Sequence, residues 1–210
     1  ARLFSLESDE LIHLDANLSA SANELIRVSM FASEPIPFDP MEIAIHQAYK
    51  EHFENDERSD FKMIHEYPLG GKPPMMTHIF ENETGVRIVA AKGAPEAIIA
   101  VSNLTDEEKI RINKAMEELA TEGFRVLGVA ETTFDSNDFL SKQQDYKFEF
   151  KGVIAFYDPP KANIQAVFEQ FYKAGIDVKI VTGDNGKTTS AIAKQVGFRG
   201  YDQTMTGAEL

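Results

Sequence analysis

A short polar segment, Thr182-Gly183-Asp184-Asn185, carries side chains suited to phosphate chemistry. It follows a predicted parallel strand, and ligands of open α/β sheets bind beyond the carboxyl ends of such strands. The Thr182 hydroxyl can donate to a phosphoryl oxygen, Asp184 can orient water, Mg²⁺ or a lysine, and Gly183 lets the backbone approach a ligand. The spacing leaves open the alternative that Asp184 only caps the next helix.

A second segment, Lys92-Gly93-Ala94-Pro95-Glu96, combines a cation with the start of a helix. A strand is predicted to end at Lys92, and Pro95 stands where helices begin. The Lys92 ammonium would then lie near the free amides of the first helical turn, an arrangement suited to an anion. An ordinary strand-to-helix turn with a solvated lysine has the same spacing.

Three further residues admit both a binding role and a structural one. Glu42 follows Asp39 by three residues, so it can complete a capping box or accept a hydrogen bond from an adenine amino group. Arg125 can pair with a phosphate through two hydrogen bonds, or it can be a solvated charge. Tyr67 can stack on a base or pack in the core.

Composition excludes several classes of protein. The 210 residues are 43% hydrophobic, enough to fill a core, and contain no cysteine for a disulfide or a thiolate metal site. The net charge of −13 repels nucleic acid, so no nucleic-acid partner is expected. No apolar run approaches the roughly 20 residues of a membrane-spanning helix. No i,i+4 histidine pair occurs, so the sequence predicts no zinc site. The five histidines are His13, His46, His52, His65 and His78.

The elements that position these residues change character near Asp158. Before it, the patterns predict helices over 19–33, 39–53 and 105–123 and strands over 75–81, 86–92, 124–132 and 146–157, with a turn over 82–85. This mixture indicates an antiparallel α+β domain over residues 1–157. Around and after it, a strand over 153–157, a helix over 162–174, a strand over 176–182 and a helix opened by 183–186 predict a parallel sheet with half of its domain missing.

In their order and spacing, the motifs resemble those of P-type ion-pumping ATPases. The resemblance runs from about residue 19 to residue 210. Its motifs are Asp39-Pro40-x-Glu42-x-Ala44, Lys92-Gly93-Ala94-Pro95-Glu96, Arg125-Val126-Leu127, Asp158-Pro159-Pro160-Lys161 and Thr182-Gly183-Asp184-Asn185.

The resemblance implies a nucleotide-binding domain over 1–157 and part of a phosphorylation domain, with a haloacid-dehalogenase-like fold, over 158–210. The implied nucleotide-binding residues are Glu42, Tyr67, Lys72, Lys92, Gly93, Arg125 and Leu127. Glu42 would face the adenine, Tyr67 would stack on it, and Leu127 would pack beside it. The implied hinge residue is Asp158. The residues implied to hold the phosphoryl group are Thr182, Gly183 and Asp184.

The family's Asp-Lys-Thr-Gly-Thr and Gly-Asp-Gly-x-Asn-Asp motifs are absent from these 210 residues. We therefore expect a cytoplasmic fragment of a membrane pump that binds ATP or ADP without turnover, with Mg²⁺ held mainly outside this chain. Its partners would be the actuator, phosphorylation and membrane domains of the pump. Heavy-metal pumps of the family typically carry a His-Pro pair in this domain, and none occurs here. The Asp-Pro-x-Glu and Lys-Gly-Ala-Pro-Glu motifs resemble those of the calcium-type branch.

Two alternatives are a soluble phosphohydrolase of the haloacid-dehalogenase superfamily and a non-catalytic interaction module. The first would need an Asp-x-Asp nucleophile pair after the first strand, and none is visible. The second is suggested by Leu69, where the family often has arginine, and by the prolines that follow Lys72.

Overall fold

The computed structural model describes residues 1–14, 17–136, 138–207 and 209. The chain divides into two compact units, one of residues 1–115 and 126–155 and the other of residues 116–125 and 156–210. Among the described residues, no helix combines the length and the apolar character needed to cross a bilayer.

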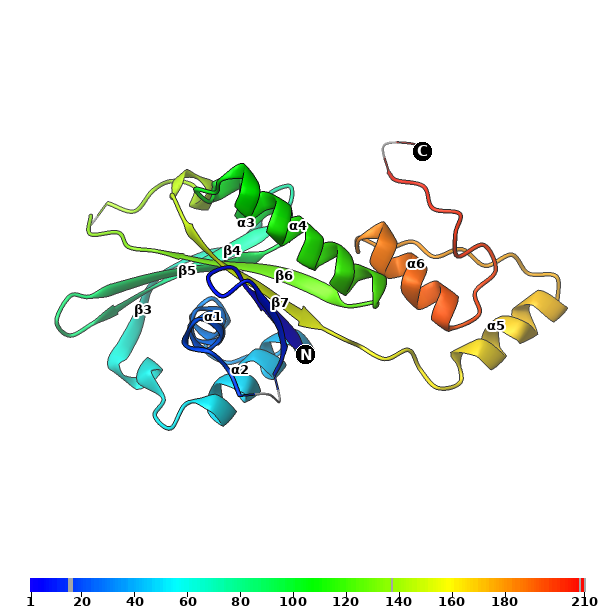
Figure 1. Cartoon of the computed structure of the whole chain (residues 1–210), viewed down its shortest axis with the longest axis horizontal. Coiled ribbons are helices and arrows are strands. Elements are labelled where there is room, and N and C mark those ends of the chain that lie inside the picture. Colours follow the sequence, from blue (N-terminus) through cyan, green and yellow to red (C-terminus); the bar gives the residue numbers. More distant parts are fainter. Residues whose placement is uncertain (15–16, 137, 208, 210) are drawn as a thin grey trace. The chain divides into compact units, whose positions relative to one another are not determined.

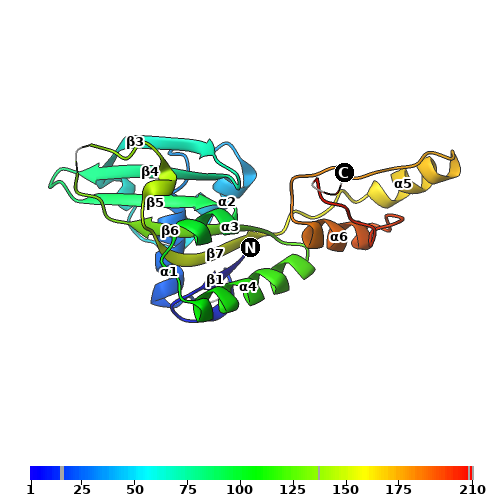
Figure 2. The same cartoon turned by 90° about the horizontal axis from the view of Figure 1, so that it is seen from above.

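A seven-stranded sheet in the order β2-β1-β7-β6-β5-β4-β3 is the framework of the first unit (Figure 1). The pairs β1/β2, β1/β7, β3/β4, β4/β5 and β5/β6 are antiparallel, and the β4/β5 pair is the hairpin that the sequence predicted. Figure 2 shows β3, β4, β5 and β6 side by side. The strands are β1 (Arg2–Ser5), β2 (Glu10–His13), β3 (Phe61–Gly70), β4 (Met75–Asn82), β5 (Arg87–Gly93), β6 (Arg125–Thr132) and β7 (Glu149–Phe156).

Helices lie on both faces of this sheet (Figure 1). Helices α1 (Ala20–Phe31) and α2 (Pro40–His52) cover one face, where α1 contacts β1 and β5. Helix α3 (Pro95–Val101) packs on β5 from the opposite face. Helix α4 (Asp106–Thr121) follows α3, and two short 3-10 helices cover 57–60 and 143–145. The apolar side chains between the helices and the sheet form the core of the unit.

Side-chain caps begin two of these helices where the sequence predicted. The Asp39 carboxylate accepts a hydrogen bond from the Met41 amide at 2.8 Å, which satisfies a free donor of α2. Thr105 and Glu108 form a reciprocal capping box before α4, with the Thr105 amide 2.8 Å from the Glu108 carboxylate. The starts of both helices are therefore determined by local hydrogen bonds.

The second unit contains helices α5 (Ile164–Lys173) and α6 (Gly186–Gln195). Its small core consists of Ala193, Val196 and Phe198, against which Ile164, Phe168 and Val178 pack. The strand predicted over 176–182 does not form, so this prediction is wrong. Its expected neighbour belongs to β7, which pairs with β1 in the first unit, and the segment has no partner strand among the described residues. The haloacid-dehalogenase-like fold therefore stays a prediction.

Candidate functional site

A buried ion pair between Lys92 and Glu42 lies on the α1–α2 face of the sheet. Lys92 is in β5, and Glu42 is in the first turn of α2. The Lys92 ammonium donates to Glu42 Oε1 and, at 2.8 Å, to the Ser33 hydroxyl. The two charged side chains are only 6% and 7% exposed. Both residues were predicted to bind nucleotide, and the fold brings them together from positions 50 residues apart.

The Glu42 carboxylate has one engaged oxygen and one free oxygen. Oε1 accepts from Lys92 and, at 3.2 Å, from the Glu34 amide, so Glu42 is turned toward β5 and not back toward the N-cap amide. Oε2 is buried and has no hydrogen-bond partner among the residues that the structure describes. An unpaired buried acceptor costs about 1–3 kcal/mol, so this oxygen suits a ligand that can donate a hydrogen bond.

The electrostatics of this pair are dominated by burial. Loss of solvation lowers the pKa of Lys92, although the hydrogen bond and the charge of Glu42 act in the opposite direction. Leu127 lies on the same face of the sheet as Lys92. Val129 is the register partner of Lys92, and residues two apart in a strand face the same side. The structure therefore groups Glu42, Lys92 and Leu127 on one face.

Tyr67 points to the opposite face of the sheet. Met76 is the register partner of Lys92, so these two side chains lie on the same face of the sheet. Tyr67 pairs with Thr77, the residue after Met76, and adjacent residues of a strand face opposite sides. The Tyr67 hydroxyl donates to the Leu140 carbonyl at 2.5 Å, and burial raises the pKa of this phenol. The core alternative considered for Tyr67 thus describes its present surroundings.

A cavity of about 560 Å³ lies on the Tyr67 side of the sheet. It is lined by Tyr67, Lys72, Gly71, Met75, Ala97 and Gln143, among others. The predicted nucleotide-binding residues of the first unit therefore occupy two places, with Tyr67 and Lys72 at this cavity and the Lys92–Glu42 pair across the sheet. Gly93 lies at a close backbone approach, because a Cβ there would be 2.5 Å from Met75 Cα.

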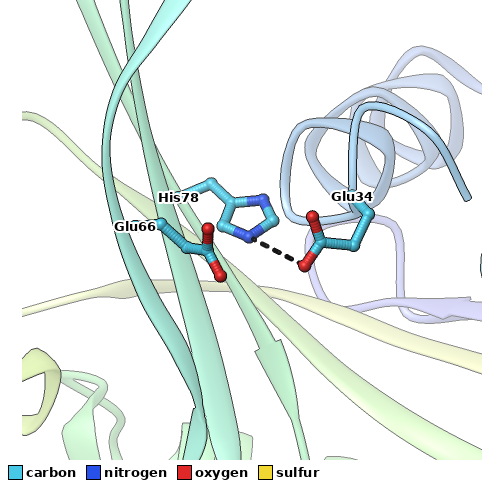
Figure 3. A group of neighbouring side chains, drawn as sticks. All are labelled: Glu34, Glu66 and His78. Atoms are coloured by element: carbon cyan, nitrogen blue, oxygen red, sulfur yellow. Dashed lines mark ion pairs between the residues drawn. The ribbon is translucent and has the colours of Figure 1, made fainter.

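A second polar cluster on the α1–α2 face consists of Glu34, Glu66 and His78 (Figure 3). His78 is fully buried in β4, and its register partner is Glu66 in β3. The His78 Nε2 atom is 4.0 Å from a Glu34 carboxylate oxygen, and Nδ1 is 3.2 Å from the Ser33 carbonyl. Burial lowers the pKa of His78, and the carboxylates of Glu34 and Glu66 act in the opposite direction. The sequence does not indicate this cluster, because Glu66 and His78 meet through cross-strand register and Glu34 joins them from the segment after α1.

The second unit brings together Arg125, Thr182 and Asp184. The Arg125 guanidinium is 3.0 Å from an Asp184 carboxylate oxygen, and the Thr182 hydroxyl accepts from the Asp184 amide at 3.0 Å. The cap of α6 is Asn185, whose side chain accepts from the Lys187 amide, so the alternative role of Asp184 as that cap is not what the structure shows.

The two remaining positions of the second unit are open to solvent. Asp158 is exposed in the segment that follows β7. At Gly183 an added Cβ would meet no atom within 4 Å. The hinge role of Asp158 and the phosphate contact of Gly183 therefore stay predictions.

Comparison with known proteins gives the class of this protein. The family model described as "P-type ATPase, cytoplasmic domain N" matches residues 33–163. The chain therefore belongs to the P-type ATPases. The matched part is their cytoplasmic N domain, a nucleotide-binding domain of cation pumps, and it contains the Lys92–Glu42 pair.

Similar proteins include pumps named for different cations. The sodium/potassium exporting P-type ATPase cta3 of Schizosaccharomyces pombe is 33% identical over 173 residues, which are 76% of this chain and 17% of that protein. Calcium-transporting ATPase 1 of Saccharomyces cerevisiae is 28% identical over 208 residues, 91% of this chain and 22% of that protein. The calcium-transporting ATPase of Bacillus subtilis is 28% identical over 149 residues, 66% of this chain and 17% of that protein. The chain thus spans about a fifth of the length of these relatives.

Proposed function

We propose that this chain binds ATP on the α1–α2 face of its sheet and presents it, in a parent cation pump, to an aspartate outside these 210 residues. The observation that carries the site is the free, buried oxygen of Glu42 beside the Lys92 ammonium. The adenine ring has an exocyclic amino group that can donate to this oxygen. Guanine has a carbonyl at the equivalent ring position, which would meet the carboxylate acceptor to acceptor.

In this proposal, the chain contributes positioning. Phosphoryl transfer depends largely on the alignment of the γ-phosphate and on stabilisation of its charge. Glu42 would select the base, and the Lys92 ammonium would hold the Glu42 carboxylate in place through their hydrogen bond. Mg²⁺ accompanies ATP in such reactions, but Glu42 is already paired with a lysine, so we assign the ion to residues outside this chain.

Entry of the base requires a local opening. Glu42 Oε2 is shielded from solvent, and the segment after α1 closes on the carboxylate through the Glu34 amide. The same segment carries two strongly exposed apolar residues, Ile36 at 85% and Phe38 at 81%. We infer that this segment moves when a nucleotide enters.

We further propose that residues 158–210 are part of the phosphorylation domain, as their motifs indicate. Thr182 and Asp184 would then act at the phosphoryl group, and Arg125 would reach the phosphates. The parent would act at a membrane, with this chain on the cytoplasmic side. The motifs support a calcium-type pump, whereas the names of the similar proteins include both calcium and sodium/potassium transport. The chain alone is expected to bind nucleotide without hydrolysing it.

The test is a nucleotide titration followed by amide shifts in NMR spectra, with ATP and GTP in parallel. We expect saturable shifts at Glu42 and Lys92 and tighter binding of ATP. The Glu42→Gln variant should lose at least tenfold in the ratio of ATP to GTP affinity, because an amide can donate to guanine. The control is Glu96→Gln, an exposed glutamate in the first turn of α3.

Two results would overturn the proposal. One is the absence of saturable shifts at millimolar ATP. The other is a set of shifts confined to Tyr67 and Lys72, with an ATP preference that survives Glu42→Gln. That second result would place the nucleotide in the cavity across the sheet.

A further inference from the structure

We propose that Glu34, Glu66 and His78 form a binding site for one divalent transition-metal cation, with Zn²⁺ as the probe ion. This site is separate from the role of Glu42 in nucleotide binding and uses other side chains. Each of the three residues offers one ligand atom, and these atoms lie within 4.8 Å of one another. Figure 3 shows the imidazole ring of His78 between the two carboxylates.

The His78 ring is already oriented as a metal ligand. Its Nδ1 atom is 3.2 Å from the Ser33 carbonyl oxygen, which can only accept, so the hydrogen is on Nδ1. The lone pair is therefore on Nε2, which points toward the carboxylates. A backbone carbonyl that binds the second ring nitrogen is the usual support of a metal-bound histidine.

The Nε2 atom is also without a hydrogen-bond partner. Among the residues that the structure describes, none bonds to it, and His78 is 0% exposed. The nearest Glu34 oxygen is 4.0 Å away, beyond hydrogen-bond distance. The Nε2 acceptor and the two carboxylates therefore face one another with no donor or cation between them. A cation placed among the three groups would bind all of them.

The charge of the cluster points the same way. Two carboxylates within 4.8 Å repel each other, and a neutral imidazole does not compensate for this repulsion. The ammonium of Lys92 is engaged with Glu42 and Ser33. A divalent cation would bring the net charge of the two carboxylates and the ion to zero.

The chemistry of the ligands selects the kind of ion. Zn²⁺ binds histidine nitrogen and carboxylate oxygen at about 2.0–2.2 Å, which places tetrahedral ligand atoms about 3.3–3.5 Å apart. The carboxylates must therefore move inward by about 1 Å, which exposed Glu66 and half-buried Glu34 can do by rotation while His78 stays fixed. Mg²⁺ and Ca²⁺ prefer oxygen ligands alone, so they should bind more weakly here.

The experiment uses the whole chain, freed of metal and without nucleotide. Co²⁺ is titrated while its visible absorption is followed, and Zn²⁺ then competes for the site. We expect one equivalent of Co²⁺ with the intense bands of low coordination number, displaced by Zn²⁺ but not by a tenfold excess of Mg²⁺. The spectrum reports the coordination geometry of the bound ion directly, so it does not depend on enzymatic activity.

Matched variants decide between this site and adventitious binding. Glu34→Gln and Glu66→Gln should each weaken Zn²⁺ binding at least tenfold, whereas the exposed controls Glu83→Gln and His13→Asn should not change it. His78→Gln should abolish the Co²⁺ bands. If that variant does not fold, Glu66→Gln still decides, because Glu66 is exposed.

The proposal is overturned if Co²⁺ affinity is unchanged in Glu66→Gln, or if His13→Asn removes the bound equivalent. It is also overturned if Mg²⁺ competes as well as Zn²⁺. Failure of ATP binding would leave these expectations as they are, since the titration contains no nucleotide.

Discussion

Replacement of Lys92 by methionine is the sharpest test of the buried pair. The change removes the hydrogen bonds of the ammonium to Glu42 and Ser33 and keeps most of the side-chain volume. Glu42, only 7% exposed, then keeps a single donor, the Glu34 amide at 3.2 Å. Removal of one partner of a buried ion pair costs about 3–5 kcal/mol, and we expect Lys92→Met to lower the free energy of unfolding by that amount.

The double variant separates pairing from burial. Burial lowers the pKa of Lys92 despite the carboxylate beside it, so a charge at this place is costly even when paired. In Lys92→Met/Glu42→Met no charge remains to be desolvated, and the stability should return to within about 1 kcal/mol of the starting protein. The two single changes should therefore be strongly non-additive, with a coupling of at least about 2 kcal/mol.

The assay is urea unfolding followed by the amide signals of the first unit, so that the second unit does not contribute. An unchanged dependence of the free energy on urea would show that only stability has changed. A loss under about 1 kcal/mol for Lys92→Met, or strict additivity in the double variant, would refute a buried, coupled pair.

Two further predictions concern other parts of the first unit. Gly93→Ala should cost about 3 kcal/mol or more in urea unfolding, because its Cβ would be 2.5 Å from Met75 Cα and from the Pro74 carbonyl, whereas Gly70→Ala, 3.6 Å from its nearest neighbour, should cost under about 1 kcal/mol. Burial raises the pKa of Glu131 in the folded chain, so its contribution to stability is full below the unfolded pKa and is lost as the pH rises through the folded pKa. The free energy of unfolding of Glu131→Gln minus that of the starting protein should therefore rise by several tenths to about 1 kcal/mol when the pH is raised from about 4.5 to about 7.5. An equal difference at the two pH values would contradict this.

The helices and hairpins could be predicted where their causes are local. Asp39 and Thr105 cap helices through side chains within three residues, and the turn after β4 is closed by Asn82, which accepts from the Val86 amide at 2.9 Å. Strands β1, β2 and β3 were not predicted. Strands β1 and β2 are four residues each and depend on β7 from the far end of the unit.

The sequence indicates candidate residues for the site but not how they are arranged. The family resemblance selected Glu42 and Lys92, and the fold joins them. The position of Tyr67 across the sheet depends on register irregularities in the β3/β4 pair, which no spacing in the sequence encodes. The pairing of Glu66 with His78 has the same origin. Alternating apolar residues over 176–182 predicted a strand, but a strand also needs a neighbour, and this one has none among the described residues.

The position of β7 determines the order in which the first unit can assemble. It lies between β1 and β6, so the earliest strands of the chain join the others only through the last one. Phe4 meets Val153, and Leu3 meets Ile154. During synthesis, the β7-facing edge of β1 therefore stays unpaired until residues 149–156 have been synthesised. Such distant pairing closes a long loop late, and it makes this strand the step on which cooperative folding of the whole sheet depends.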